Sequence, residues 1–327
     1  MKHLFLLFAC FFSLNLMAQN PRLHFLEYPD TLHKKRLYTA VGGGLTIYSG
    51  LSIAFWNTWY TQSEISSFHT FNDFPQWNQM DKGGHFFSAW TECNYAFQGA
   101  KWTGMKRKNA IIVAASVGTG LQATTEIFDG FVSDYGFSWS DIAANTLGVT
   151  AFVTQELVWK EQRIKFKVSS TRTDYPTDPL FSIDGNSVTT LRERAHDLYG
   201  EPFYVTLMKD YNDMNLWATV NIHSFLPNKQ TTKFPKWLNI AAGYGAQNLY
   251  GGTENRWEKD GAVFQLDPNL YPRYRQFFLS FDVDMARLPV KNRFLRGVLG
   301  ALNWVKIPAP TLEINTLGNV KFHPIYW

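Results

Sequence analysis

The hydrophobic pattern of the chain changes period once. From about residue 31 to 162 the apolar residues recur at helical spacing or in solid runs, and from about residue 204 onward they alternate with polar residues. Between these parts, residues 167–185 are rich in Ser, Thr, Pro and Asp, which is typical of a linker. We therefore predict an α+β protein, with a helical bundle at residues 31–162, a linker and short helix at 163–200, and an antiparallel β-rich part at 201–327.

Four helices are expected in the first part: near residues 36–60, from residue 81, at 108–126 and at 140–159. The first is long enough to cross a bilayer or to lie in one, and its glycines and serines would let another helix approach closely. The alternative for this segment is a buried helix of a soluble protein. A further short amphipathic helix is expected at 188–199, with Ser187 as its N-cap and Gly200 as its stop.

The alternation in the last part predicts five to seven strands, with one helix-like interruption at residues 294–305. It is clearest where Phe277, Leu279 and Phe281 share one face. Aromatic-rich alternating strands are typical of outer-membrane barrels, but a barrel of that class needs at least about eight strands. We favour an antiparallel sheet with one face packed on the helices over a small outer-membrane barrel, and expect either to be associated with the outer membrane.

The N-terminus indicates export. A basic start and an apolar run precede Ala18, a small residue suited to cleavage, so residues 1–18 are expected to be a signal peptide. Leu7–Cys10 resembles the lipid-attachment box of a bacterial lipoprotein, but few residues precede it and apolar sequence continues past it, so we expect no lipid on Cys10. Cleavage leaves Cys93 alone, which excludes a disulfide framework and a cysteine-rich metal site.

Charge and aromatic content limit the partners. The formal net charge of +4 is mild and no long Lys/Arg block is present, so nucleic acid is not an expected partner. Aromatic residues make up 17% of the chain, with 12 Trp, 15 Tyr and 27 Phe. Such residues gather where a protein meets a membrane interface, although a core of large side chains is an equal explanation. Membrane lipid or an envelope membrane protein is the partner that we expect.

Three pairs of polar residues interrupt the predicted helices. Each pair has a spacing of three or four residues, which places its members on one helix face: Asp81 with His85, Glu126 with Asp129, and Asp141 with Asn145. If the helices form a bundle, the pairs can converge on one pocket. Carboxylates beside an imidazole suit a divalent metal ion such as Zn or Mn, or a proton-transfer site. Ionisable groups inside a bundle are costly, which favours a functional role.

Each of these residues also has a purely structural explanation. Asp81 opens a predicted helix and could be its N-cap. Ser138 could cap the fourth helix, with Asp141 in its first turn. Asn145 could form a hydrogen bond between helices, and a single His85 in a core is more often a satisfied histidine than a ligand.

The same residues carry a family resemblance. Asp81-Lys82-x-x-His85-Phe86, then Glu126-x-x-Asp129, then the segment 136–145 resemble the YfiM-like family of predicted periplasmic lipoproteins. The chain is similar, more loosely, to VanZ-like membrane proteins, which share an Asp-Lys-x-x-His start and a later Asp-x-x-x-Asn step. The resemblance covers roughly residues 75–160 and implies a compact helical unit at the cell envelope, but no activity. The strand-rich C-terminal part resembles Bacteroidota versions of the family.

Two functions remain in competition. We favour a structural or assembly protein of the envelope that binds lipid or a membrane-protein partner, because no nucleophile motif is present. The alternative is a metal-dependent or acid–base enzyme acting on a lipid or cell-wall substrate. Its candidate catalytic residues are Asp81, His85, Glu126 and Asp141; Asp129 joins them as a metal candidate, with Lys82, Ser138 and Asn145 beside the site. A weaker third possibility is an ion that only ties the helices together.

Overall fold

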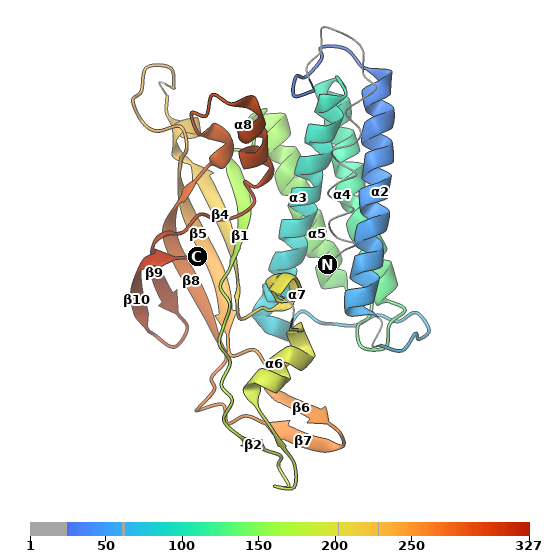
Figure 1. Ribbon diagram of the computed structural model, residues 1–327, viewed down its shortest axis with the longest axis vertical. Helices are drawn as coiled ribbons and strands as arrows, with labels where there is room; N and C mark the ends of the chain where they lie inside the picture. Colours follow the sequence, from blue (N-terminus) through green and yellow to red (C-terminus); the bar gives the residue numbers. More distant parts are fainter. Residues whose placement is uncertain (1–24, 61–62, 202, 228) are drawn as a thin grey trace.

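The computed structural model describes residues 25–60, 63–201, 203–227 and 229–327. The expected signal peptide and Cys10 lie outside the described residues. A group of long helices stands beside a curled sheet, and a smaller unit of short helices and hairpins projects beyond one end of both (Figure 1). The prediction of helices followed by an antiparallel β-rich part is therefore confirmed.

The helical part consists of α2 (Lys34–Trp59), α3 (Met80–Trp102), α4 (Arg107–Asp129) and α5 (Trp139–Val158). Ser138 caps α5, because its Oγ accepts a hydrogen bond from the backbone N–H of Asp141 at 3.1 Å. Asp81 is not an N-cap: α3 begins one residue earlier, and its cap residue makes no side-chain cap bond. The Asp81 side chain is therefore available for other contacts.

Helix α3 packs closely against both α4 and α5 because glycines stand at the two crossings. A Cβ on Gly118 would lie 2.5 Å from the Sγ of Cys93, and a Cβ on Gly148 would overlap the carbonyl oxygen of Phe86. The absence of these side chains lets the backbones approach. Polar side chains on the facing sides of the three helices consequently lie within reach of one another.

Helix α2 lies on the outside of this group (Figure 1). Near its N-terminal end, Arg36 Nη1 donates to the carbonyl oxygen of Trp102 at 3.1 Å. Between its ends the apolar side chains face outward; Leu45 and Leu51 are 61% and 64% exposed. The alternative of a buried soluble helix for this segment is therefore wrong.

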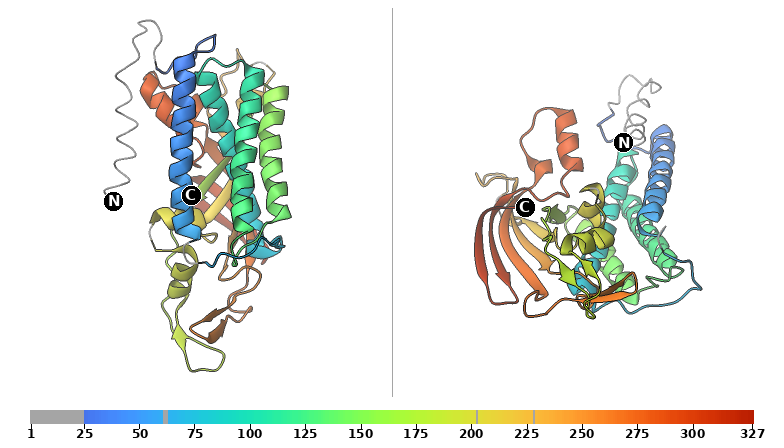
Figure 2. Two further views of the ribbon diagram at one scale, coloured as in Figure 1. Left: turned by 90° about the vertical axis from the view of Figure 1, so that its right-hand side faces the viewer. Right: turned by 60° about the horizontal axis from the view of Figure 1, so that its bottom comes forward.

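The main sheet has the strand order β1-β4-β5-β8-β9-β10, with antiparallel neighbours throughout. Its strands are β1 (Ile164–Ser170), β4 (Met214–Asn221), β5 (Leu238–Gln247), β8 (Tyr274–Val283), β9 (Ala309–Asn315) and β10 (Val320–Tyr326). The right-hand view of Figure 2 shows how strongly it curves. No ladder joins β1 to β10 in the described part of the chain, so the sheet is open and the barrel alternative is wrong.

The alternation of these strands is as predicted, but the buried face is the polar one. Side chains such as Asn239, Gln276 and Asp282 are buried on the inner side of the curve, whereas Leu279 and Phe281 are 55% and 53% exposed on the outer side. The expected packing of the apolar face on the helices is found at the β1–β4 edge, which contacts α3, and extends to β5, whose Tyr244 packs against the core cluster of Met80. Over most of the sheet that expectation is wrong.

The remaining elements are short: β2 (Leu180–Phe181), β3 (Val188–Thr189), α6 (Leu191–Tyr199), α7 (Phe203–Lys209), β6 (Arg256–Lys259), β7 (Ala262–Gln265) and α8 (Arg293–Ala301). The predicted linker begins instead with β1. Thr190, not Ser187, caps α6 by accepting from the backbone N–H of Glu193 at 3.1 Å. Gly200 ends this helix at a φ of 79°, as expected.

Candidate functional site

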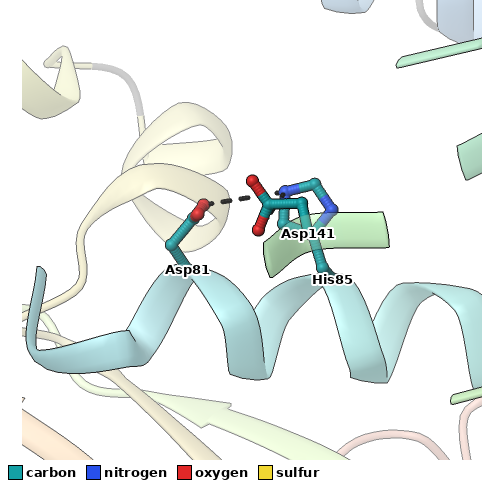
Figure 3. A group of neighbouring side chains, drawn as sticks. All are labelled: Asp81, His85 and Asp141. Atoms are coloured by element: carbon teal, nitrogen blue, oxygen red, sulfur yellow. Dashed lines mark ion pairs between the residues drawn. The ribbon is translucent and has the colours of Figure 1, made fainter. Parts of the chain in front are cut away.

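One end of the helical group carries all three predicted polar pairs, because α3 and α5 begin there and α4 ends there. The Nε2 atom of His85 lies 3.8 Å from Asp81 Oδ1 and 3.7 Å from Asp141 Oδ1, and its Nδ1 atom lies 3.3 Å from Glu126 Oε1. Figure 3 shows Asp81, His85 and Asp141 pointing toward one another. The structure thus brings together the four residues that the sequence singled out for chemistry. We call Asp73, Asp81, Lys82, His85, Glu126, Asp141 and Asn145 the polar cluster.

Lys82 is the only lysine in the polar cluster and it binds three carboxylates. Its Nζ atom lies 2.7 Å from each of Asp73 Oδ2, Asp81 Oδ2 and Asp141 Oδ1. The side chain of Lys82 is 10% exposed, so these ion pairs are largely shielded from water. Lys82 therefore ties a loop residue and two helices together around one ammonium group.

The two nitrogens of His85 face different surroundings. Nδ1 lies 3.2 Å from Asn145 Oδ1 and 3.3 Å from Glu126 Oε1, and both of these oxygens are acceptors. A proton on Nδ1 is donated to Asn145 Oδ1 with Glu126 Oε1 beside it, which leaves the lone pair of the neutral ring on Nε2, on the side of Asp81 and Asp141. The arrangement fixes both the tautomer and the orientation of the imidazole.

Burial and charge shift the pKa values of the cluster in opposite directions. Burial raises the pKa of Glu126 to about 8 and that of Asp141 to about 7, despite the opposing effect of His85. Burial would also raise the pKa of Asp73, but hydrogen bonds with Asp141, Lys82 and two serines outweigh it and hold that pKa at about 2. Burial would lower the pKa of His85, yet the surrounding carboxylates raise it above its ordinary value. The site therefore contains both protonated and ionised carboxyl groups.

Three buried polar atoms of the polar cluster have no hydrogen-bond partner among the described residues. They are Glu126 Oε1, on a side chain that is completely buried, Asn145 Nδ2, and Asp141 Oδ1, whose ion pair with Lys82 lacks hydrogen-bond geometry. Buried polar atoms are normally satisfied, so these three require an explanation within the site.

Several contributing residues could not be identified from the sequence. Asp73 precedes α3 in a loop, and it accepts hydrogen bonds from Ser138 Oγ at 2.6 Å and Ser140 Oγ at 2.7 Å. Tyr211, from the C-terminal part, donates to Asp81 Oδ1 at 2.8 Å. No spacing rule links either residue to the helical pairs, because Asp73 is not helical and Tyr211 is 130 residues away from Asp81.

The predicted metal candidate Asp129 lies at the edge of the site rather than in it. It accepts a hydrogen bond from the hydroxyl group of Tyr60, and burial raises its pKa to about 6. It is not among the residues whose possible ligand atoms all lie within 4.8 Å of one another, which are Asp81, His85 and Asp141. Asp129 therefore helps to attach the end of α2 to α4.

Comparison with known proteins gives one match. Residues 71–156 match the family described as "Predicted periplasmic lipoprotein (DUF2279)", and this range contains the whole polar cluster. No curated protein and no solved structure matches the chain. The match supports a cell-envelope protein that is exported to the periplasm. Its description as a lipoprotein favours lipidation, contrary to the expectation for Cys10, and it does not address the VanZ-like resemblance or a Bacteroidota origin.

Proposed function

We propose that this envelope protein is associated with the outer membrane, that lipid acyl chains cover its apolar outer faces, and that the polar cluster binds the polar part of a lipid or of a membrane-protein partner. The observation that carries the proposal is the reversed polarity of the main sheet. In water a sheet buries its apolar face, whereas here the buried face holds Asn239, Gln276 and Asp282. Apolar side chains outside and polar ones inside are typical of strands in contact with lipid.

The exposed apolar surface also lies on two sides of the molecule. The outer face of the sheet forms one side and helix α2 stands on the other (Figure 1). On the helical side, Leu45 of α2, Ile112 of α4 and Leu157 of α5 are between 55% and 64% exposed. A single protein partner covers one patch, whereas lipid surrounds a molecule. Acyl chains are therefore the better explanation for apolar faces on both sides.

The two ends of the helical group differ in a way that fits a lipid–water boundary. Exposed lysines gather at the end where α2 and α4 begin: Lys34, Lys35, Lys106 and Lys108. Exposed aromatic residues gather at the opposite end, in the loops and at the start of α5: Phe68, Phe71, Phe74, Phe131 and Trp139. Aromatic belts and basic residues are common at membrane interfaces. The polar cluster lies at the aromatic end, at the level where lipid head groups would lie.

Length and composition add a smaller argument. Among the described residues, α4 meets the hydropathy and length criterion for a helix that could cross a membrane. A core helix of a soluble protein can meet the same criterion, so α4 supports the proposal only together with the exposed apolar faces.

Cell fractionation and vesicle flotation test the proposal. We expect the wild-type protein in the outer-membrane fraction, and we expect the purified protein to float with phospholipid vesicles. Leu279→Glu with Phe281→Glu should weaken flotation, because each places a charge on the outer face of the sheet. The matched control is Ile183→Glu with Val188→Glu, which changes exposed apolar residues of the projecting unit and should leave flotation unchanged. A wild-type protein that stays in the soluble fraction without detergent contradicts the proposal.

A second candidate function is an acid–base enzyme acting on a lipid or cell-wall substrate. It is favoured by the position of His85, which has Glu126 on one ring nitrogen and Asp81 and Asp141 on the side of the other. Such a histidine can take up a proton at one nitrogen and release one at the other. Complementation of a deletion strain tests it: Glu126→Gln should abolish rescue while leaving the folded protein at its normal level. Full rescue by both Glu126→Gln and His85→Gln contradicts the enzyme.

A further inference from the structure

We propose that Asp81, His85 and Asp141 bind a divalent transition-metal cation, Zn²⁺ or Mn²⁺, and that Glu126 and Asn145 hold the imidazole in position for it. The proposal goes beyond lipid contact and does not depend on it. It assigns a defined ligand to the polar cluster. A bound ion would also supply a Lewis acid to the enzyme considered as the second candidate function.

The distances around His85 Nε2 are the first argument. Asp81 Oδ1 lies 3.8 Å and Asp141 Oδ1 lies 3.7 Å from this nitrogen, which is too far for a hydrogen bond. Two ligands of one ion, each about 2.0–2.2 Å from it, lie roughly 3–4 Å apart. The gap that separates these atoms is therefore the size that one metal ion requires.

A histidine–carboxylate pair elsewhere in the chain shows the contrast. His323 Nε2 lies 2.7 Å from Glu313 Oε2 in the main sheet, which is the distance of a direct charge-assisted hydrogen bond. In the polar cluster His85 Nε2 has two carboxylates beside it and forms a hydrogen bond with neither. Packing of the helices holds these groups apart, so the space between them is built into the fold.

The other side of His85 has the surroundings of a metal ligand. Nδ1 is within 3.3 Å of the acceptor oxygens of Asn145 and Glu126, so Nε2 carries the lone pair. Metal-binding histidines usually donate their second ring N–H to a carboxylate or carbonyl group, which fixes the ring and strengthens the ligand. Glu126 and Asn145 are nine-tenths or more buried and can do this without competition from water.

The charges of the cluster give an independent argument. Asp73, Asp81, Glu126 and Asp141 contact one lysine and one histidine, and the lysine already binds three of the four carboxylates. Glu126 Oε1 is buried and has no hydrogen-bond partner in the described part of the chain. The polar cluster therefore holds four carboxyl groups against two cationic side chains, and a divalent cation would offset the charge of the carboxyl groups that lose their protons when it binds.

Lys82 does not replace such an ion. Its ammonium group lies against Asp81 Oδ2, whereas the atom that faces His85 is Asp81 Oδ1. Lys82 shares Asp141 Oδ1 with the proposed ion, so the two compete for that oxygen. Removal of the ammonium group should accordingly strengthen metal binding.

Metal analysis of the purified full-length chain tests the inference. The protein is treated with a chelator, dialysed separately against Zn²⁺ and Mn²⁺, and its metal content is measured by mass spectrometry. We expect one ion per chain in the wild type, an affinity at least about 100-fold lower in His85→Ala and Asp81→Asn, and a loss of about 10–100-fold in Glu126→Ala. His196→Ala, in an exposed histidine–glutamate pair, is the control and should bind as the wild type does.

A second measurement separates ligand loss from unfolding. Co²⁺ is added in place of Zn²⁺, and its visible absorption reports nitrogen and carboxylate coordination directly, while circular dichroism reports folding. Folded Asp81→Asn should lose the absorption band, and Lys82→Met should bind Co²⁺ more tightly than the wild type. A folded wild type that binds none of the three ions, or that binds one no better than Asp81→Asn does, overturns the inference. Flotation of that metal-free protein with vesicles would leave the lipid proposal intact.

Discussion

Replacement of Lys82 by methionine tests how far the polar cluster depends on its single ammonium group. Lys82 Nζ lies 2.7 Å from three carboxylates, and the residue is 9% exposed. Methionine fills a similar volume but leaves Asp73, Asp81 and Asp141 facing one another without the ammonium group that contacts all three. Removing one partner of a buried ion pair costs about 3–5 kcal/mol. We expect a loss of this size in the free energy of unfolding, and a melting temperature lower by at least about 6 °C.

The pH dependence identifies the cause of this loss. Burial raises the pKa of Asp141 to about 7 and would raise that of Asp73, but hydrogen bonds that include Lys82 hold the Asp73 pKa at about 2. In the variant these folded-state pKa values rise, so the carboxyl groups take up protons as the pH falls. A group with a raised folded pKa destabilises the fold at high pH and is relieved by protonation. The stability deficit of Lys82→Met should therefore be larger at pH 8 than at pH 5.

Thermal unfolding followed by tryptophan fluorescence, at both pH values, provides the measurement. Lys108→Met is the matched control, because Lys108 is exposed and should show little change. A Lys82→Met protein as stable as the control, or one whose deficit does not shrink at pH 5, refutes the reasoning.

Three further changes test separate parts of the account. Gly148→Ala should lower the free energy of unfolding by about 1–3 kcal/mol because the new Cβ would overlap the backbone of α3, whereas Gly84→Ala, with nothing within 4 Å of its Cβ, should not lower it. Equal midpoints of the two variants in chemical denaturation contradict this prediction. Asp282→Ala should lower the free energy of unfolding by about 3–5 kcal/mol, because it leaves the fully buried Lys167 without its carboxylate partner. A double-mutant cycle should show much of this loss as coupling between the two residues. Burial raises the pKa of Glu126 to about 8, so the wild type should lose stability relative to Glu126→Gln as the pH rises from 5 to 8. A stability difference between the two proteins that does not change with pH contradicts this prediction.

The helices and their polar pairs were accessible from the sequence because both depend on local spacing. Asp81 and His85 share a face of α3 for the reason that any residues four apart do. The close approach that brings them to Glu126 and Asp141 depends on Gly118 and Gly148, and no periodicity specifies where two helices cross. The convergence of the pairs was consequently a hypothesis until the structure placed them.

The sheet shows what an alternating pattern leaves open. Alternation specifies which residues share a face, but it does not specify which face is buried. Residues 164–170 illustrate the same point. Lys165, Lys167 and Ser169 are polar, and part of this strand therefore resembles a linker in the sequence. In the structure Lys167 pairs with Asp282 and Lys165 with Asp284, because the inner side of the sheet is polar. These partners are more than 100 residues away, beyond any local pattern.

Contact between lipid and the outer face of the main sheet is the central claim, and spin labels test it most directly. A label is attached to a cysteine placed at Leu279, and another to one at Ile183, in protein reconstituted into phospholipid vesicles. Both positions are exposed, at 55% and 63%. We expect the label at 279 to collide more often with oxygen, which concentrates in lipid, than with a water-soluble nickel complex, and the label at 183 to show the reverse. A label at 279 that is as accessible to the nickel complex as the label at 183 contradicts the claim.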